Sequence, residues 1–209
     1  MKQYYILIGK EEFIIADSTI SRTSILDAAE EVLRRFGMAK SNLSDVARAL
    51  GVSHAAIYRH FDNKAALREA MAERWLNHVM EPLNAIVANN DEPEIRLRSW
   101  LDTLRAFKRS RALTDPELFA MYMALTAEAA DLLHRHVEDM LEQLTVIIAD
   151  GIAAGVFAPC DARESARAFY LATTRFHHPS HAGEWELSDS DINYEITWKL
   201  LMNGLTIRS

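Results

Sequence analysis

The side chains best suited to chemistry in this sequence are hydrogen-bonding groups gathered on one short stretch, residues 53 to 64. If this stretch is helical, with about 100° between residues, Ile57 and Phe61 share one face and can anchor it in a core. The remaining faces then carry two small residues and several donors, namely His54, Ala55, Ala56, Tyr58, Arg59 and His60. Such a helix suits the major groove of duplex DNA, where the alanines allow close approach and can touch thymine methyl groups. Arg59 and His54 can then donate to base edges, and Tyr58 and His60 can reach phosphates.

Two short helices are expected to position these side chains. Asn42 can begin a helix over 43–50 that stops at Gly51, and Ser53 can begin the next over 54–61, because both side chains accept hydrogen bonds from N-terminal N–H groups. A first helix carries apolar residues at positions 25, 29, 32 and 36 and stops at Gly37, and a fourth begins at Lys64. The pattern predicts a helix-turn-helix, to which Ser41 and Lys64 can add phosphate contacts.

The charge distribution agrees with this interpretation. The chain has 209 residues and a net charge of −7, which by itself argues against a polyanionic partner. The stretch from Arg22 to Arg68, however, holds eight Lys and Arg against five Asp and Glu. A small basic segment followed by a larger acidic one indicates a nucleic-acid reader carried by a second domain with another task.

The N-terminal motifs resemble a known family. They are ILDAA from Ile25, LSDVA from Leu43, GVSHAAIYRHF from Gly51 and NKAAL from Asn63, and they are similar to the N-terminal domain of TetR-type (tetracycline-repressor-like) transcriptional regulators. The resemblance implies an all-helical homodimer that binds a palindromic operator and whose C-terminal domain dimerises and holds an effector. Matched residue by residue, and with the capping serine included, the expected DNA-binding set is Ser41, Ser53, His54, Ala55, Ala56, Tyr58, Arg59, His60 and Lys64. The family often has Gly-Thr where this chain has Ala55-Ala56, so its operator sequence cannot be taken from relatives.

Three segments are expected. Residues 1–21 contain two β-rich runs around a turn and form an extension, either a hairpin or an arm; 22–68 form the helix-turn-helix domain; 69–209 form an effector-binding and dimerisation domain. The fold class is all-α, because helical periodicity runs from Arg22 to the C-terminus. Further helices are expected over 64–89, 94–112, 115–127, 128–154, 163–176 and 190–207, with Pro82 kinking or splitting the first.

The last two helices are expected to form a dimer interface, because two DNA half-sites about 34 Å apart require two recognition helices. One apolar stripe consists of Tyr194, Trp198, Leu201 and Leu205, and a neighbouring one of Ile196, Leu200 and Ile207. The preceding helix adds Phe169, Tyr170, Thr173 and Phe176. The predicted interface consists of the first stripe and these four residues; the alternative is that both stripes belong to the core of a single chain.

An effector pocket is expected among aromatic, Met and His side chains of neighbouring helices. They are Trp75, Trp100, Phe107, Phe119, Met121, Tyr122, Met123 and His136, and they favour an apolar or aromatic ligand. The alternative is that the same residues are ordinary core. His177, His178, His181 and Glu184 lie close together in sequence, but without metal-site spacing they are interpreted as a loop, so no metal and no cofactor beyond an effector is expected.

Other classes of protein find little support. The single Cys160 cannot form an internal disulfide, no stretch is apolar for long enough to span a membrane, and there is no signal-peptide pattern, so a cytoplasmic protein is expected. There is no Walker loop, GxSxG, HExxH or GxGxxG motif, so no enzyme is expected. The leading hypothesis is a repressor released from DNA by an effector. The alternative is a helix-turn-helix protein whose C-terminal half docks another protein instead of a small ligand.

Overall fold

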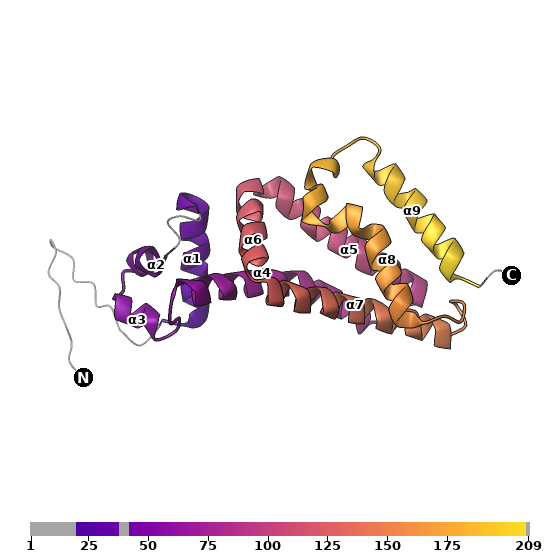
Figure 1. Cartoon of the computed structure of the whole chain (residues 1–209), viewed down its shortest axis with the longest axis horizontal. Coiled ribbons are helices and arrows are strands. Elements are labelled where there is room, and N and C mark those ends of the chain that lie inside the picture. Colours follow the sequence, from indigo (N-terminus) through magenta and orange to yellow (C-terminus); the bar gives the residue numbers. More distant parts are fainter. Residues whose placement is uncertain (1–19, 38–41, 208–209) are drawn as a thin grey trace. The chain divides into compact units, whose positions relative to one another are not determined.

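The computed structural model describes residues 20–37 and 42–207, which are helical apart from turns and one isolated bridge between Phe157 and Thr206 (Figure 1). The predicted all-α fold class is confirmed. The chain divides into two compact units, Met1–Leu67 and Arg68–Ser209. The expected hairpin over residues 1–21 lies, but for its last two residues, outside the described part of the chain, and so does Ser41.

The N-terminal unit contains α1 (Arg22–Phe36), α2 (Leu43–Leu50), α3 (His54–Tyr58) and the first turn of α4 (Lys64–Val87). Each helix begins at a polar side chain that accepts a hydrogen bond from the first turn. Asn42 Oδ1 accepts from the Asp45 N–H at 3.0 Å, and Ser53 Oγ accepts from the Ala56 N–H at 3.2 Å. Such caps satisfy N–H groups that a helix cannot pair internally, so the sequence itself fixes where these short helices start.

The core of the N-terminal unit is a small apolar cluster. Its buried members are Ile25, Ala29, Val32 and Leu33 of α1, Leu43, Val46 and Ala47 of α2, and Ile57, Phe61 and Leu67. Phe36, expected on the buried face of the first helix, is instead exposed, because α1 continues one turn beyond its core contacts.

The C-terminal unit holds the rest of α4 and five further α-helices. They are α5 (Pro93–Thr114), α6 (Pro116–Glu128), α7 (Ala130–Ala153), α8 (Ala162–His177) and α9 (Ser190–Leu205), with a short 3₁₀ helix, η2 (Pro179–Glu184), before the last. Pro82 does not split α4, which runs unbroken past it. The α8 start predicted from the sequence is also observed, since Asp161 Oδ1 accepts from the Glu164 N–H at 2.8 Å.

Helix α5 is central to this unit and contacts α6, α7, α8 and η2. Its Trp100 is fully buried and donates from Nε1 to Gln143 Oε1 at 2.8 Å. At the far end of α7, Gly151 touches the ring of Phe157 so closely that an added Cβ would lie 2.1 Å from a ring carbon. These contacts join α5, α7 and the chain after α7 into one core.

Candidate nucleic-acid interface

Helices α2 and α3 are joined by a three-residue turn. Gly51 adopts the left-handed conformation, with φ 66° and ψ 31°, and its N–H donates back to the end of α2. The Val52 N–H then donates to the Ala47 carbonyl at 3.0 Å. A residue with a Cβ is strained in this conformation, so glycine fixes the sharp change of direction between the two helices.

The outer side of α3 carries exposed hydrogen-bonding groups, while its inner side is anchored. Ile57 is fully buried, whereas Tyr58 is 50% exposed and His54 and Arg59 are exposed as well. The rings of His54 and Tyr58 lie 6.4 Å apart, one turn from each other along the helix. The arrangement presents a phenol hydroxyl, an imidazole and a guanidinium together on one surface.

The chain after α3 is held to α1. Arg22 donates from Nη1 to the His60 carbonyl at 3.4 Å, and its guanidinium lies 4.4 Å from the centre of the buried Phe61 ring. His60 and Lys64 are half-buried. The backbone on both sides of α3 is therefore fixed, which gives the exposed side chains a defined position.

Two expectations about this stretch are wrong. Ala56, predicted to face outward, is 1% exposed. The short α3 packs against α2, and this contact buries Ala56 as well as the face that carries Ile57. The helix also ends at Tyr58 rather than at Phe61. Ala55 is exposed, and Ser53 uses its hydroxyl for the cap.

The C-terminal unit gathers half of the predicted pocket residues into an aromatic cluster. Trp75 of α4 stacks on Tyr122 of α6 with ring centres 4.4 Å apart, and Phe107 and Phe119 lie 6.0 and 6.2 Å from Trp75. The fully buried Trp100 lies in the helical core instead, and Met121 and Met123 are half-buried.

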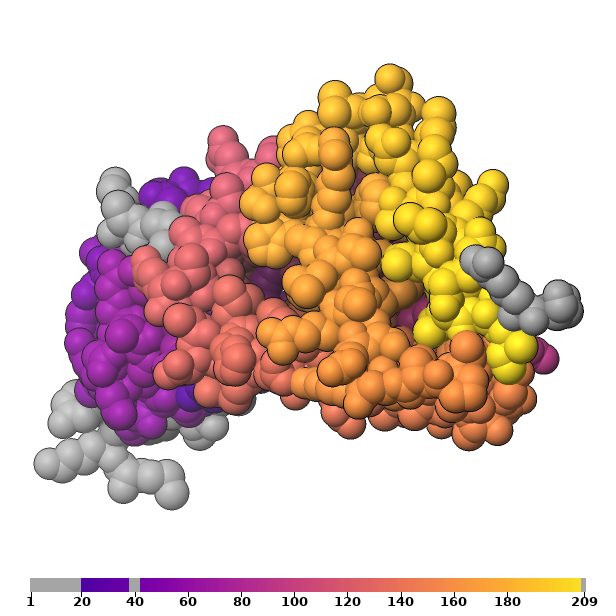
Figure 2. All heavy atoms as spheres, turned by 45° about the vertical axis from the view of Figure 1, so that its right-hand side comes forward, coloured from indigo at the N-terminus to yellow at the C-terminus, as the bar shows by residue number. Residues whose placement is uncertain are grey.

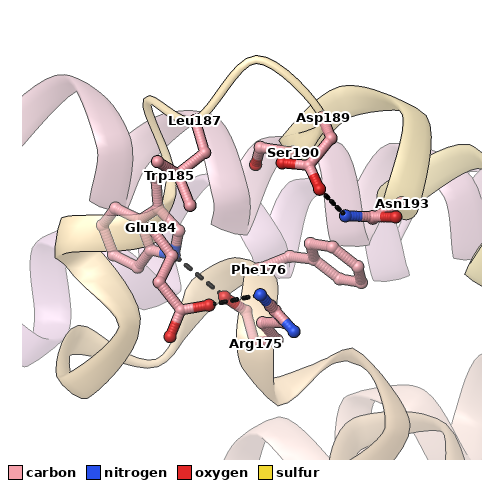
Figure 3. A pocket seen from close by; sticks show the side chains of 8 residues that line it. All are labelled: Arg175, Phe176, Glu184, Trp185, Leu187, Asp189, Ser190 and Asn193. Carbon is pink, nitrogen blue, oxygen red and sulfur yellow. Dashed lines mark hydrogen bonds and ion pairs between the residues drawn. The ribbon is translucent and has the colours of Figure 1, made fainter.

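Two hollows at the surface of this unit are lined by none of the predicted pocket residues. The smaller lies among α8, η2 and α9, where Arg175 pairs with Glu184 at 2.6 Å and Trp185 Nε1 donates to the Arg175 carbonyl at 3.0 Å (Figure 3). The wider is an open groove lined by Glu92, Glu94, Ile95, Arg98, Ser99, Val156 and Trp198. The effector pocket expected from the sequence therefore stays a prediction.

One polar side chain that the sequence analysis did not single out, Lys108, lies inside the same unit together with two histidines that it did, His136 and His177. Lys108 of α5 is 7% exposed, and burial lowers its pKa from 10.5 to about 8. Burial and the charge of Lys108 lower the pKa of His136 to about 4 and that of His177 to about 3. Both imidazoles are therefore neutral at pH 7, beside a buried cation.

The histidines around Pro179 point to different partners. His178 Nδ1 lies 2.7 Å from Ser180 Oγ, and His181 Nδ1 lies 3.0 Å from Glu184 Oε1, while His177 is buried beside Thr173. Over residues 20–37 and 42–207, no group of three His, Cys, Asp or Glu side chains is arranged to hold a metal ion.

The predicted dimer interface is wrong for four of its eight residues. Phe169, Thr173, Phe176 and Tyr194 are buried within the chain itself. Ion pairs explain the orientation of α9, because Arg98 and Arg105 of α5 bind Glu195 and Asp191 and turn the Tyr194 side inward. Tyr170, Trp198, Leu201 and Leu205 are half-buried against the same core.

The neighbouring stripe, Ile196, Leu200 and Ile207, faces outward. All three side chains are exposed, Leu200 by 71%, and the exposed Ile192 extends the stripe one turn earlier, so that Ile192, Ile196 and Leu200 recur at every fourth residue of α9. Leu171 of α8 is exposed too. Figure 2 shows α8 in orange and α9 in yellow at the outer surface of the C-terminal unit. Large apolar side chains at this spacing form a continuous apolar strip, which is typical of a contact surface.

Within the described residues, no helix is both long and apolar enough to cross a membrane. The fold and the exposed side of α3 define a helix-turn-helix protein with an all-helical second unit.

Two family models match the chain. The model for bacterial regulatory proteins of the tetR family matches residues 25–71, and the model for the tetracyclin-repressor-like C-terminal domain matches residues 93–195. The chain belongs to the TetR family.

Relatives of known sequence and structure agree with this assignment. An uncharacterized HTH-type transcriptional regulator of Mycobacterium tuberculosis is 36% identical over 90 residues, which cover 43% of this chain and 45% of that protein. The match thus spans less than half the length of that relative. SmeT, the repressor of the Stenotrophomonas maltophilia multidrug efflux pump SmeDEF, is similar in structure with a TM-score of 0.67 and 19% identity, over 93% of this chain and 94% of SmeT. A structure of SmeT in complex with triclosan is similar too, with a TM-score of 0.66 and 18% identity over 90% of this chain and 92% of that one. FadR from Bacillus subtilis in complex with stearoyl-CoA has a TM-score of 0.62 and 16% identity, over 88% of this chain and 99% of FadR.

Proposed function

We propose that this chain is a sequence-specific DNA-binding transcriptional regulator that acts as a homodimer on a palindromic operator. The observation that carries the proposal is the outer side of α3, where His54, Tyr58 and Arg59 are exposed while Ile57 holds the helix in the core. This is the arrangement by which a recognition helix offers donors to a major groove. Operator binding would place the protein in the cytoplasm.

The roles of the side chains on this surface differ. Arg59 can donate two hydrogen bonds to a guanine edge and so contributes to sequence preference. Tyr58 and Lys64 can donate to phosphate oxygens, which are the same at every base pair, and so contribute to affinity alone. Ala55 can touch a thymine methyl group.

The experiment is selection of bound sequences from a pool of random duplexes, followed by salt titration of the selected operator. We expect a palindromic consensus. Tyr58→Phe and Lys64→Ala should weaken binding to all sequences similarly, whereas Arg59→Ala should relax preference at particular positions. Arg35→Ala is the matched control, because Arg35 is an exposed arginine at the end of α1 paired with Glu31. A pool that remains unselected at moderate salt would contradict the proposal.

The proposed dimer uses the outward stripe of α9, Ile192, Ile196 and Leu200, with Leu171 of α8. Burying four large apolar side chains against their copies removes them from water, and each contributes about 1.5–3 kcal/mol when fully buried. Leu200→Glu should therefore give a monomer in analytical ultracentrifugation, and operator affinity should fall with it. Leu113→Glu, at an exposed leucine near the end of α5, should leave the dimer intact. A dimer unaffected by Leu200→Glu would place the interface elsewhere.

We further propose that the C-terminal unit binds a small apolar or aromatic effector that releases the protein from DNA, so that it acts as a repressor. The aromatic cluster of Trp75, Phe107, Phe119 and Tyr122 supports this, and so do the triclosan and stearoyl-CoA complexes of SmeT and FadR. The effector would alter the tilt of α4, move Lys64 and change the separation of the two recognition helices. Effector-saturated protein that holds operator as tightly as free protein would refute this mechanism.

A further inference from the structure

The C-terminal unit buries one cation that no carboxylate of the described residues balances. Lys108 is 7% exposed, and burial alone accounts for its lowered pKa. Four arginines of the same helix are paired, Arg96 with Asp150, Arg98 with Glu195, Arg105 with Asp191 and Arg109 with Glu186. Lys108 differs from them because it is buried and has no ion pair among the described residues. A buried charge without a partner destabilises a fold unless a ligand supplies the opposite charge.

Two buried imidazoles lie on the helices that pack against α5, His136 on α7 and His177 on α8. His136 of α7 has a buried Nε2 with no hydrogen-bond partner among the described residues, and His177 of α8 lies 3.3 Å from Thr173 Oγ1. The charge of Lys108 contributes to the low pKa of both rings. Neutral imidazoles carry one N–H each and no charge, so they can donate hydrogen bonds but cannot balance the ammonium.

The group that would satisfy these side chains is an anion with several acceptor positions. A carboxylate accepts up to four hydrogen bonds, and those from an ammonium are charge-assisted. Lys108 keeps a small exposed surface, so its surroundings are not sealed from solvent.

Aromatic rings lie on α4, α5 and α6 of the same unit, where the Arg111 guanidinium lies 5.8 Å from the centre of the Trp75 ring. Phe107 precedes Lys108 on α5 and touches Trp75, and Phe119 lies edge-on to both Trp75 and Trp185 at 6.2 and 6.4 Å. These rings can contact a flat apolar body attached to the anion.

We propose that the C-terminal unit binds an aromatic carboxylic acid, with the carboxylate held by Lys108 and the N–H of His136, and the ring against Trp75 and Phe119. The proposal deepens the effector role and rests on it, because the acid is the signal that the proposed regulator would read. A site of this kind requires a negatively charged ligand, whereas a purely apolar pocket does not.

The test is calorimetric titration of the full-length protein with matched probes at constant ionic strength. The probes are 2-naphthoate, benzoate, the corresponding amides, and sulfate as an inorganic anion. We expect at least one acid to bind at least tenfold more tightly than its amide, and Lys108→Met to remove that preference while amide binding persists. Lys199→Met, at an exposed lysine of α9, should keep it. Equal binding of acids and amides, no binding of either acid, a preference retained by Lys108→Met, or sulfate binding as tightly as the acids would each overturn the proposal.

Operator binding by the same preparations separates this proposal from the function on which it rests. Without probe, wild type and Lys108→Met should hold the selected operator equally, and the acid should release wild type alone. Intact operator binding without acid binding overturns the carboxylate site only. A wild-type chain that selects no duplex overturns the DNA-binding function, whatever the calorimetry gives.

Discussion

Replacing Lys108 by methionine should stabilise the ligand-free protein. Methionine matches the aliphatic part of the lysine side chain and removes the ammonium that the fold buries without a carboxylate partner. One pKa unit corresponds to about 1.4 kcal/mol, so a fall from 10.5 to about 8 means that the charged form of Lys108 costs the fold about 3 kcal/mol at pH 7. The unfolding free energy should rise by an amount of this order in Lys108→Met.

The lowered pKa of Lys108 also predicts how the free energy of unfolding changes with pH. The unfolded chain keeps the Lys108 proton up to about pH 10.5, whereas the folded chain loses it near pH 8. The unfolded state therefore binds more protons between these values, and wild-type stability rises with pH across that window. Lys108→Met lacks this rise, so its advantage should be largest below pH 8 and shrink above it.

The assay is urea unfolding followed by circular dichroism at pH 7 and at pH 9.5, with equal chain concentrations because dimerisation contributes to stability. Lys199→Met serves as the control and should change stability by less than about 0.5 kcal/mol at either pH, because its side chain is exposed. A Lys108→Met protein that is no more stable than wild type at pH 7, or whose difference is the same at both pH values, would refute the reasoning.

Three further predictions concern the packing and the buried histidines. Gly151→Ala should lower the midpoint of urea unfolding by the equivalent of about 1–3 kcal/mol, since its Cβ would collide with the Phe157 ring; an unchanged midpoint would count against the contact. Ala56→Leu should destabilise the N-terminal unit by a similar amount in hydrogen exchange, whereas Ala55→Leu, on the exposed side of α3, should leave protection unchanged and alter operator binding only. The unfolding free energy should fall as pH is lowered from about 6.5 toward 4, because His136 and His177 bind protons in the unfolded chain but stay neutral in the fold. His136→Gln should flatten this pH dependence. Parallel plots of stability against pH for the variant and wild type would contradict the lowered pKa of His136.

The parts of the fold that depend on neighbouring residues could be predicted from the sequence. Asn42, Ser53 and Asp161 each accept a hydrogen bond from an N–H three residues on, so the start of a helix is encoded within one turn. Gly51 likewise marks the turn between α2 and α3 because its backbone conformation suits glycine.

The predictions that failed depend on partners distant in sequence. Ala56 is small enough to fit either side of a helix, and the packing of α2 against α3 decides that it is buried. From the sequence alone, either apolar stripe of α9 could face the core. Arginines of α5 bind Glu195 and Asp191, and these ion pairs turn the Tyr194 side of α9 inward.

Lys108 could not be predicted as a buried residue for the same reason. A lysine in a helix is normally expected to be exposed to solvent. Lys108 is buried because α7 and α8 pack against α5. The signal that could have drawn attention to it is the stretch from Arg105 to Arg111, where four cations follow one another and only some can reach acidic partners.

The distribution of tryptophan gives the molecule a built-in optical label. All four indoles, Trp75, Trp100, Trp185 and Trp198, belong to the C-terminal unit, and the N-terminal unit has none. Selectively excited indole emission therefore reports on the C-terminal unit alone. Loss of structure in that unit can be followed in the unmodified chain, without attaching a dye.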